Sequence, residues 1–138
     1  MNIARKRDAF TLIEIVIALT LGISILAVAT TMIQKYMKNA AISTTRQTML
    51  NIQQQLVLYK LNMNRYPTSR EGLQALIVPP QPRGGWAGPY LSEKELNDSW
   101  TNPIEYRTGN EIENKEYKYY ELYSPGDRKG GISISIGE

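Results

Sequence analysis

Residues 12–29 read LIEIVIALTLGISILAVA, eighteen consecutive residues in which Glu14 carries the only charge. At about 1.5 Å per residue, a helix of this length crosses most of the hydrocarbon of a bilayer. We therefore predict one membrane-spanning helix near the N-terminus. Arg5, Lys6 and Arg7 precede it, and basic residues tend to remain on the cytoplasmic side. Everything after about residue 33 is then expected on the opposite side of the membrane.

Two simpler interpretations fit the same segment. One is a plain anchor that is never cleaved. The other is a secretory signal with a small-residue cleavage site at Ala27-Val28-Ala29, which releases the chain from Thr30 onward. An apolar run at the long end of the signal-peptide range, and a helical pattern without a breaker near residue 29, argue against the secretory signal.

Glu14 distinguishes a generic anchor from a more specialised segment. A carboxylate inside an apolar membrane segment costs on the order of 2.5–3.5 kcal/mol unless it finds a partner or stays near hydrated headgroups. The string around it, KRDAFTLIE (residues 6–14), resembles the processing site of type IV pilin-like precursors. In that family a short basic leader and a small residue precede Phe, and Glu is the fifth residue of the mature chain.

The resemblance implies that a prepilin peptidase in the membrane cuts between Ala9 and Phe10 and methylates the new amine of Phe10. Ala9 stands where the family nearly always has Gly. Cutting removes a leader, residues 1–9, whose three basic residues and Asp8 give a net charge of +2. It also creates a cationic amine that can pair with Glu14 of a neighbouring subunit. Phe10 and Glu14 are therefore the expected assembly residues.

An apolar stripe continues beyond the membrane segment. Its members are spaced three, four, three and four residues apart, as on one face of a helix: Met49, Ile52, Leu56, Tyr59 and Met63. We predict one helix from about Phe10 to Asn62, with a transmembrane and assembly part at 10–33 and an amphipathic part to about residue 63. A free coiled coil is the alternative, but the stripe holds for only about two heptads where three or four are normally needed.

The head, residues 34–138, includes that amphipathic part and a small sheet. The segment Asn62–Pro67 ends the helix, and Thr68 with Glu71 is typical of a capping box that opens a short helix through Leu73, Leu76 and Ile77. Residues 79–89 hold four prolines and three glycines and predict a surface loop ordered by packing. Three strands of an antiparallel sheet are expected at 104–108, 118–124 and 132–136. The fold class is therefore α+β and pilin-like.

Composition excludes several classes of function. The chain has neither cysteine nor histidine, which removes disulfides, thiolate metal sites and the commonest general base. No glycine-rich nucleotide motif or nucleophile elbow is present, so we expect no enzymatic activity. The net charge is +3, of which the leader contributes +2, and glutamates outnumber lysines around the tyrosines of 117–123. We expect no nucleic-acid partner.

Four later blocks resemble the major pseudopilin of type II secretion systems over nearly the whole chain: LYKLNMNRYPTSREGLQALI (58–77), GPYL (88–91), DSWTNPIEY (98–106) and YELYSPGD (120–127). The resemblance implies a subunit of the periplasmic pseudopilus, polymerised with copies of itself and with minor pseudopilins on an inner-membrane assembly platform to drive export of folded proteins. The precursor would be a single-pass inner-membrane protein with a periplasmic head. The alternative is a type IV pilin for adhesion, motility or DNA uptake, although adhesive pilins commonly carry a C-terminal disulfide.

The last loop departs from the family pattern. Many major pseudopilins bind calcium there through an Asp after a Ser-x-Gly stretch, a second Asp further on, and backbone carbonyls. Asp127 matches the first Asp, but the chain enters Ile132 without an acidic partner, and Arg128 and Lys129 add positive charge. Calcium usually takes six to eight oxygen ligands. We expect no cofactor, with Asp127 closing a turn, and a calcium ion at Asp127 is the alternative.

Overall fold

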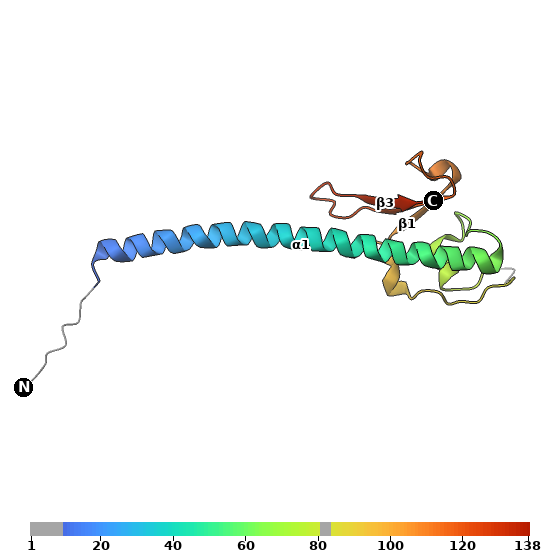
Figure 1. Cartoon of the computed structure of the whole chain (residues 1–138), viewed down its shortest axis with the longest axis horizontal. Helices are drawn as coiled ribbons and strands as arrows, with labels where there is room; N and C mark the ends of the chain where they lie inside the picture. Colours follow the sequence, from blue (N-terminus) through green and yellow to red (C-terminus); the bar gives the residue numbers. More distant parts are fainter. Residues whose placement is uncertain (1–9, 81–83) are drawn as a thin grey trace, which may run out of the picture. The chain divides into compact units, whose positions relative to one another are not determined.

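A computed structural model describes residues 10–80 and 84–138 (Figure 1). The predicted leader and Ala9 lie outside the described residues. The chain divides into two compact units, one that runs to Lys38 and one that comprises Asn39–Glu138. The elements follow in the order α1 (Leu12–Met63), η1 (Gly72–Leu76), η2 (Glu93–Leu96), β1 (Glu105–Thr108), η3 (Gly109–Glu111), β2 (Tyr120–Ser124) and β3 (Ile134–Gly137), where η denotes a 3₁₀ helix.

The long helix is present within two residues of its predicted bounds. It begins at Leu12 instead of Phe10 and ends at Met63 instead of Asn62. Asn64, directly after its end, has a φ of +57°, the left-handed conformation that commonly terminates a helix and that Asn tolerates better than most residues. Pro67 follows shortly afterwards and cannot continue the helix.

The predicted stripe forms the centre of the head's core. Met49, Ile52, Leu56 and Tyr59 have no exposed surface. They pack in one cluster with apolar residues from the rest of the head: Leu73, Ala75, Leu76, Leu91, Leu96, Ile104, Tyr120, Leu122 and Ile134. The stripe is therefore covered by the chain's own head, and the coiled-coil alternative is wrong.

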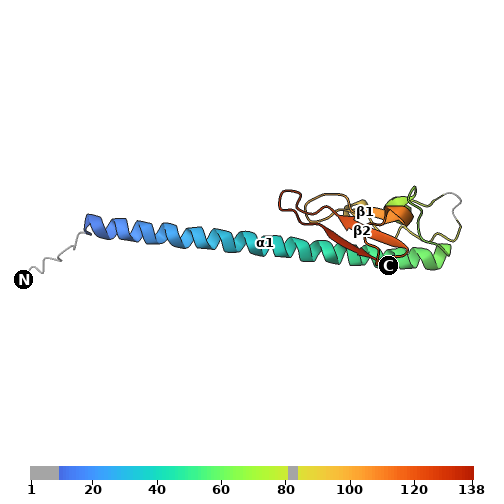
Figure 2. The same cartoon turned by 90° about the horizontal axis from the view of Figure 1, so that it is seen from above.

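The three strands form one antiparallel sheet in the order β1-β2-β3, which lies along the second half of α1 in both views (Figures 1 and 2). Tyr106 pairs with Leu122, and Leu122 pairs with Ile136 on its other side. The first two strands begin one or two residues later than predicted, and the third is shifted from 132–136 to Ile134–Gly137. The predicted α+β fold with a three-stranded antiparallel sheet is confirmed.

The turn after α1 contains the predicted capping interactions. The Thr68 N–H donates to the Glu71 carboxylate over 2.8 Å, and the Glu71 N–H donates back to the Thr68 hydroxyl over 3.3 Å. The helix that follows is a 3₁₀ helix, and it stops at Leu76 before Ile77. Gly72 has a φ of +56°, which interrupts the regular α conformation, so the Thr68–Glu71 pair closes a turn ahead of the helix.

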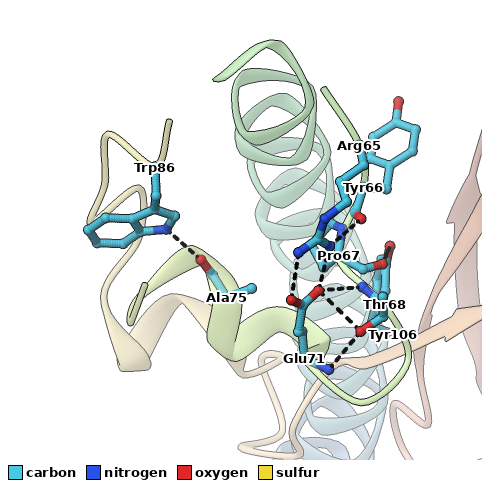
Figure 3. Close-up of polar contacts among 8 residues, drawn as sticks. All are labelled: Arg65, Tyr66, Pro67, Thr68, Glu71, Ala75, Trp86 and Tyr106. Atoms are coloured by element: carbon cyan, nitrogen blue, oxygen red, sulfur yellow. Dashed lines mark hydrogen bonds and ion pairs between the residues drawn. The ribbon is translucent and has the colours of Figure 1, made fainter. Parts of the chain in front are cut away.

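Packing and hydrogen bonds hold the C-terminal side of the proline-rich loop to η1. The Trp86 indole N–H donates to the Ala75 carbonyl over 2.8 Å (Figure 3), and the Tyr90 N–H donates to the Leu76 carbonyl over 2.7 Å. The rings of Trp86 and Tyr90 meet edge to face with centroids 5.7 Å apart. This side of the loop is thus ordered by packing, as the sequence predicts.

Candidate assembly surface

The described residues of the N-terminal unit present a largely apolar, exposed surface between Phe10 and Ile33. Its large apolar side chains are between 47% exposed, at Val16, and 81% exposed, at Phe10. By length and composition the helix can cross a membrane, and none of its most apolar stretch is buried within the protein. A contiguous apolar surface of this extent marks contact with lipid or with other proteins. This surface is the candidate site for membrane insertion and assembly.

The hydroxyl groups in this segment bond to the helix itself. Thr20, Ser24, Thr30 and Thr31 each donate to a backbone carbonyl three or four residues earlier, over 2.8–2.9 Å. Such bonds satisfy the hydroxyls without water, as an apolar surrounding requires. Glu14 is then the one ionisable side chain between Leu12 and Ile33.

Glu14 closes a capping box with Thr11 at the start of α1. Its Oε2 accepts hydrogen bonds from the Thr11 N–H over 2.8 Å and from the Thr11 hydroxyl over 2.9 Å. The Thr11 hydroxyl accepts the Glu14 N–H over 3.3 Å. These bonds satisfy two orphan donors at the helix start. Oε1 of Glu14 takes no part in the capping box. The donors of Thr11 are uncharged, so they do not neutralise the carboxylate.

Phe10 and Glu14 share one face of the chain. They are four positions apart in sequence, the spacing of neighbours on a helix, and both line a shallow hollow with Ile15, Ala18 and Leu19. The structure thus brings together the two predicted assembly residues that it describes. Thr11 is the residue that sequence reasoning missed here, although the Thr-x-x-Glu spacing is the capping-box signal that also marks Thr68 and Glu71.

In the head, the first residue of the DSWTNP block (98–103), Asp98, is a buried carboxylate that holds the turn of this block together. Asp98 is 6% exposed and accepts hydrogen bonds from the Ser124 hydroxyl (2.7 Å), the Asn102 N–H (2.8 Å) and the Trp100 N–H (2.9 Å). Burial raises the pKa of a carboxyl, but these hydrogen bonds outweigh it and hold the pKa of Asp98 below its usual value. The side-chain amide of Asn102 also donates to Asp98 and to the Gly126 carbonyl. Asp98 therefore joins two loops that are distant in sequence.

Asp127 closes the turn that follows β2. Its Oδ1 accepts the Lys129 N–H over 3.1 Å, and its carbonyl accepts the N–H groups of Gly130 (3.0 Å) and Ile132 (3.3 Å). Within residues 10–80 and 84–138, no group of three or more acidic, histidine or cysteine side chains is close enough together to hold a metal ion. The structure brings no such cluster to Asp127.

Comparison with known proteins identifies relatives along most of the chain. Residues 32–133 match the family model of "Type II secretion system (T2SS), protein G". The "Type II secretion system core protein G" of Vibrio cholerae is 30% identical, over 97% of this chain and 82% of that protein. The protein of the same name from Dickeya chrysanthemi is 31% identical, over 94% of this chain and 76% of that protein.

A solved structure shares the fold. The crystal structure of the major pseudopilin from the type 2 secretion system of enterohaemorrhagic Escherichia coli superposes with a TM-score of 0.58 at 22% sequence identity. The match covers 74% of this chain and 90% of that one. The two chains therefore share a fold over the matched part.

Proposed function

Since this chain belongs to the family of type II secretion system protein G, we propose that it is the repeating subunit of a periplasmic pseudopilus whose polymerisation drives export of folded proteins. Copies associate through the exposed apolar face of α1. The amine of Phe10, created by cleavage after Ala9, pairs with Glu14 of a neighbouring copy. The observation that carries the proposal is a single carboxylate, Glu14, in an otherwise uncharged and exposed apolar segment.

Energetics supports a role for this charge pair. Moving an apolar helix from lipid into a bundle of helices gains little from the hydrophobic effect, because lipid tails are as apolar as the side chains of the helix. The capping hydrogen bonds from Thr11 satisfy Oε2 of Glu14 but do not neutralise its charge. A cationic amine would remove the cost of an unpaired carboxylate, which is on the order of 2.5–3.5 kcal/mol. Assembly would then be favoured over the isolated membrane form.

The charge of the leader supports cleavage of residues 1–9 before assembly. Arg5, Lys6 and Arg7 favour a cytoplasmic N-terminus and a periplasmic head. Three fixed cations resist extraction of the helix from the membrane, so removal of residues 1–9 would both free the helix and create the amine. The partners of the subunit would be copies of itself, minor pseudopilins, a prepilin peptidase and an inner-membrane assembly platform.

The type IV pilin alternative has less support. The N-terminal processing motif is common to both kinds of filament, whereas the match to protein G covers residues 32–133, which include most of the head. The family is structural, and the proposed role of this chain needs no catalytic residue.

The first experiment is N-terminal sequencing and intact-mass measurement of the protein purified from membranes of its native host. A chain that begins at Phe10 with one added methyl group supports the proposal. A chain that begins at Met1 would leave a plain anchor, and one that begins at Thr30 would make this a secreted protein and refute the filament.

The second experiment tests the charge pair with Glu14→Gln, which keeps the size of the side chain and removes its charge. We expect filaments in cells to fall at least about tenfold, the effect of a pair worth about 1.4 kcal/mol or more, while the amount in the membrane stays constant. Glu111→Gln, in an exposed part of the head, is the matched control. Filaments at the wild-type level with Glu14→Gln would show that the pairing is not needed.

A further inference from the structure

The segment between β2 and β3 is tied to the Asp98 turn. The Ser124 hydroxyl donates to Asp98 Oδ2 over 2.7 Å and accepts the Gly126 N–H over 3.1 Å. The Asn102 side-chain amide donates to the Gly126 carbonyl over 3.0 Å. The start of the loop is therefore fixed at both Ser124 and Gly126, through side chains that Asp98 itself orients.

The loop also closes on itself. Gly126 has a φ of +54°, and a side-chain Cβ at this position would lie 2.5 Å from the Ile132 carbonyl oxygen. The two sides of the loop thus meet directly at Gly126 and Ile132. The Ile132 N–H donates to the Asp127 carbonyl, and the Gly130 N–H donates to the same oxygen.

Several oxygens of this loop already accept hydrogen bonds within the head. The family pattern supplies two Asp carboxylates and backbone carbonyls as ligands, whereas this loop contains Asp127 as its one acidic residue. Here Asp127 Oδ1 accepts the Lys129 N–H, the Asp127 carbonyl accepts two N–H groups, and the Gly126 carbonyl accepts Asn102. Calcium takes six to eight oxygens, several of them from carboxylates. Arg128 and Lys129 beside Asp127 add positive charge, so the donor set does not fit the ion.

We propose that the buried carboxylate of Asp98 fastens the loop between β2 and β3 in this chain, and that the loop takes no calcium ion. Asp98 receives hydrogen bonds from its own turn, through Trp100 and Asn102, and from the end of β2, through Ser124. Charge-assisted hydrogen bonds to a buried carboxylate are stronger than neutral ones. The inference concerns the stability of the head and does not depend on how the filament assembles.

The test is thermal unfolding of the full chain in detergent, followed by tryptophan fluorescence. Both tryptophans, Trp86 and Trp100, lie in the head, so the signal reports the head alone. We expect the same Tm in millimolar calcium and in excess EGTA, and no saturable heat when calcium chloride is titrated into the protein. A Tm that falls by several degrees in EGTA, or saturable calcium binding that Asp127→Asn abolishes, would overturn the proposal.

Two matched variants test the role of Asp98. Asp98→Asn removes a buried charge with little change in size and should lower the Tm by about 4–8 °C or more in both buffers. Asp127→Asn makes the same change at a half-exposed position and should change the Tm by much less. If Asp98→Asn does not fold, Ser124→Ala removes one hydrogen bond to the carboxylate and should still lower the Tm. Equal Tm values for Ser124→Ala, Asp127→Asn and the unchanged protein would overturn the role of Asp98.

Discussion

Arg65 and Glu71 form a bidentate ion pair in the segment between α1 and η1. Arg65 Nη1 lies 2.6 Å from Glu71 Oε2, and Nη2 lies 2.7 Å from Oε1 (Figure 3). The same carboxylate accepts the Thr68 N–H, while Tyr106 in β1 donates to the Pro67 carbonyl over 2.9 Å. One carboxylate therefore fixes both the end of the long helix and the turn that follows it.

Replacing Glu71 with Gln should destabilise the head. The change removes the ion pair and one acceptor of the turn, so we expect the free energy of unfolding at pH 7 to fall by about 1–3 kcal/mol. The Arg65 side chain is 39% exposed, which favours the lower part of that range. Urea unfolding followed by tryptophan fluorescence measures the effect, with Glu111→Gln as the exposed control. Equal midpoints for the two variants would contradict the prediction.

The same pair predicts a loss of stability in acid. The hydrogen bonds from Arg65 lower the pKa of Glu71 to about 2, from an ordinary value of 4.5. A carboxyl whose pKa is lower in the folded state contributes stability that is present above its unfolded pKa and is lost as the pH falls toward its folded pKa. The lowered pKa of Asp98 acts in the same direction. The Tm should therefore fall from about pH 5 to pH 2, and less steeply in Glu71→Gln. Parallel curves for the two proteins would refute the assignment.

Two leucines on the same helix should differ sharply in their effect. Leu56 has no exposed surface, whereas Leu61 is 69% exposed. Leu56→Ala removes buried methyl groups and leaves a cavity, so we expect a loss of about 2–5 kcal/mol in the free energy of unfolding of the head. Leu61→Ala should change it by no more than about 0.5 kcal/mol. Similar urea midpoints for the two variants would show that the stripe is not the core.

Periodic features of the sequence predict most of the fold. The apolar run and the stripe from Met49 to Met63 fix one long helix, because a spacing of three and four residues is a local property of the chain. The three strands are found in the expected order, but their ends differ by one or two residues. Strand ends depend on which residues of a partner strand remain to pair, as Glu105 with Tyr123 does here, and a single sequence does not contain that information.

The polar connections of the head could not be predicted in the same way. Asp98 has partners four and 26 residues further along the chain, and no periodicity links these positions. The one local signal is the Asp–Asn spacing, since Asp side chains often accept N–H groups of their own turn. The positive φ of Gly72 could not be predicted from the sequence either, so the expected helix is found as a 3₁₀ helix. In the N-terminal unit, the Thr-x-x-Glu spacing of Thr11 and Glu14 contains the signal for a capping box. The use of Phe10 and Glu14 in assembly stays a prediction.

Arg107 in β1 lies among three glutamates, of which Glu105 and Glu121 are on the sheet and Glu113 is in the loop before β2. Its guanidinium is 2.8 Å from Glu105 and 3.8 Å from Glu121, and it covers the ring of Tyr123 at 3.9 Å. Its Nη1 lies 2.9 Å from Glu113 without the alignment of a hydrogen bond. The Glu121 side chain is only 3% exposed and accepts the Glu113 N–H over 2.9 Å. Within the described part of the head, Arg107 is therefore the positively charged side chain that lies beside the buried carboxylate of Glu121.

A double-mutant cycle tests whether Arg107 compensates for the buried charge of Glu121. Arg107→Leu leaves that carboxylate without its cation, so we expect a loss of up to about 3–5 kcal/mol in the free energy of unfolding. Adding Glu121→Leu removes the uncompensated charge and should recover part of this loss, because apolar replacement of both partners of a buried pair is often close to neutral. The two single changes should therefore be non-additive by more than about 0.5 kcal/mol in urea unfolding. Strict additivity would mean that Arg107 stabilises the sheet only through Glu105, Glu113 and the ring of Tyr123. The hydrogen bond from the Glu113 N–H would then be what stabilises the buried carboxylate of Glu121.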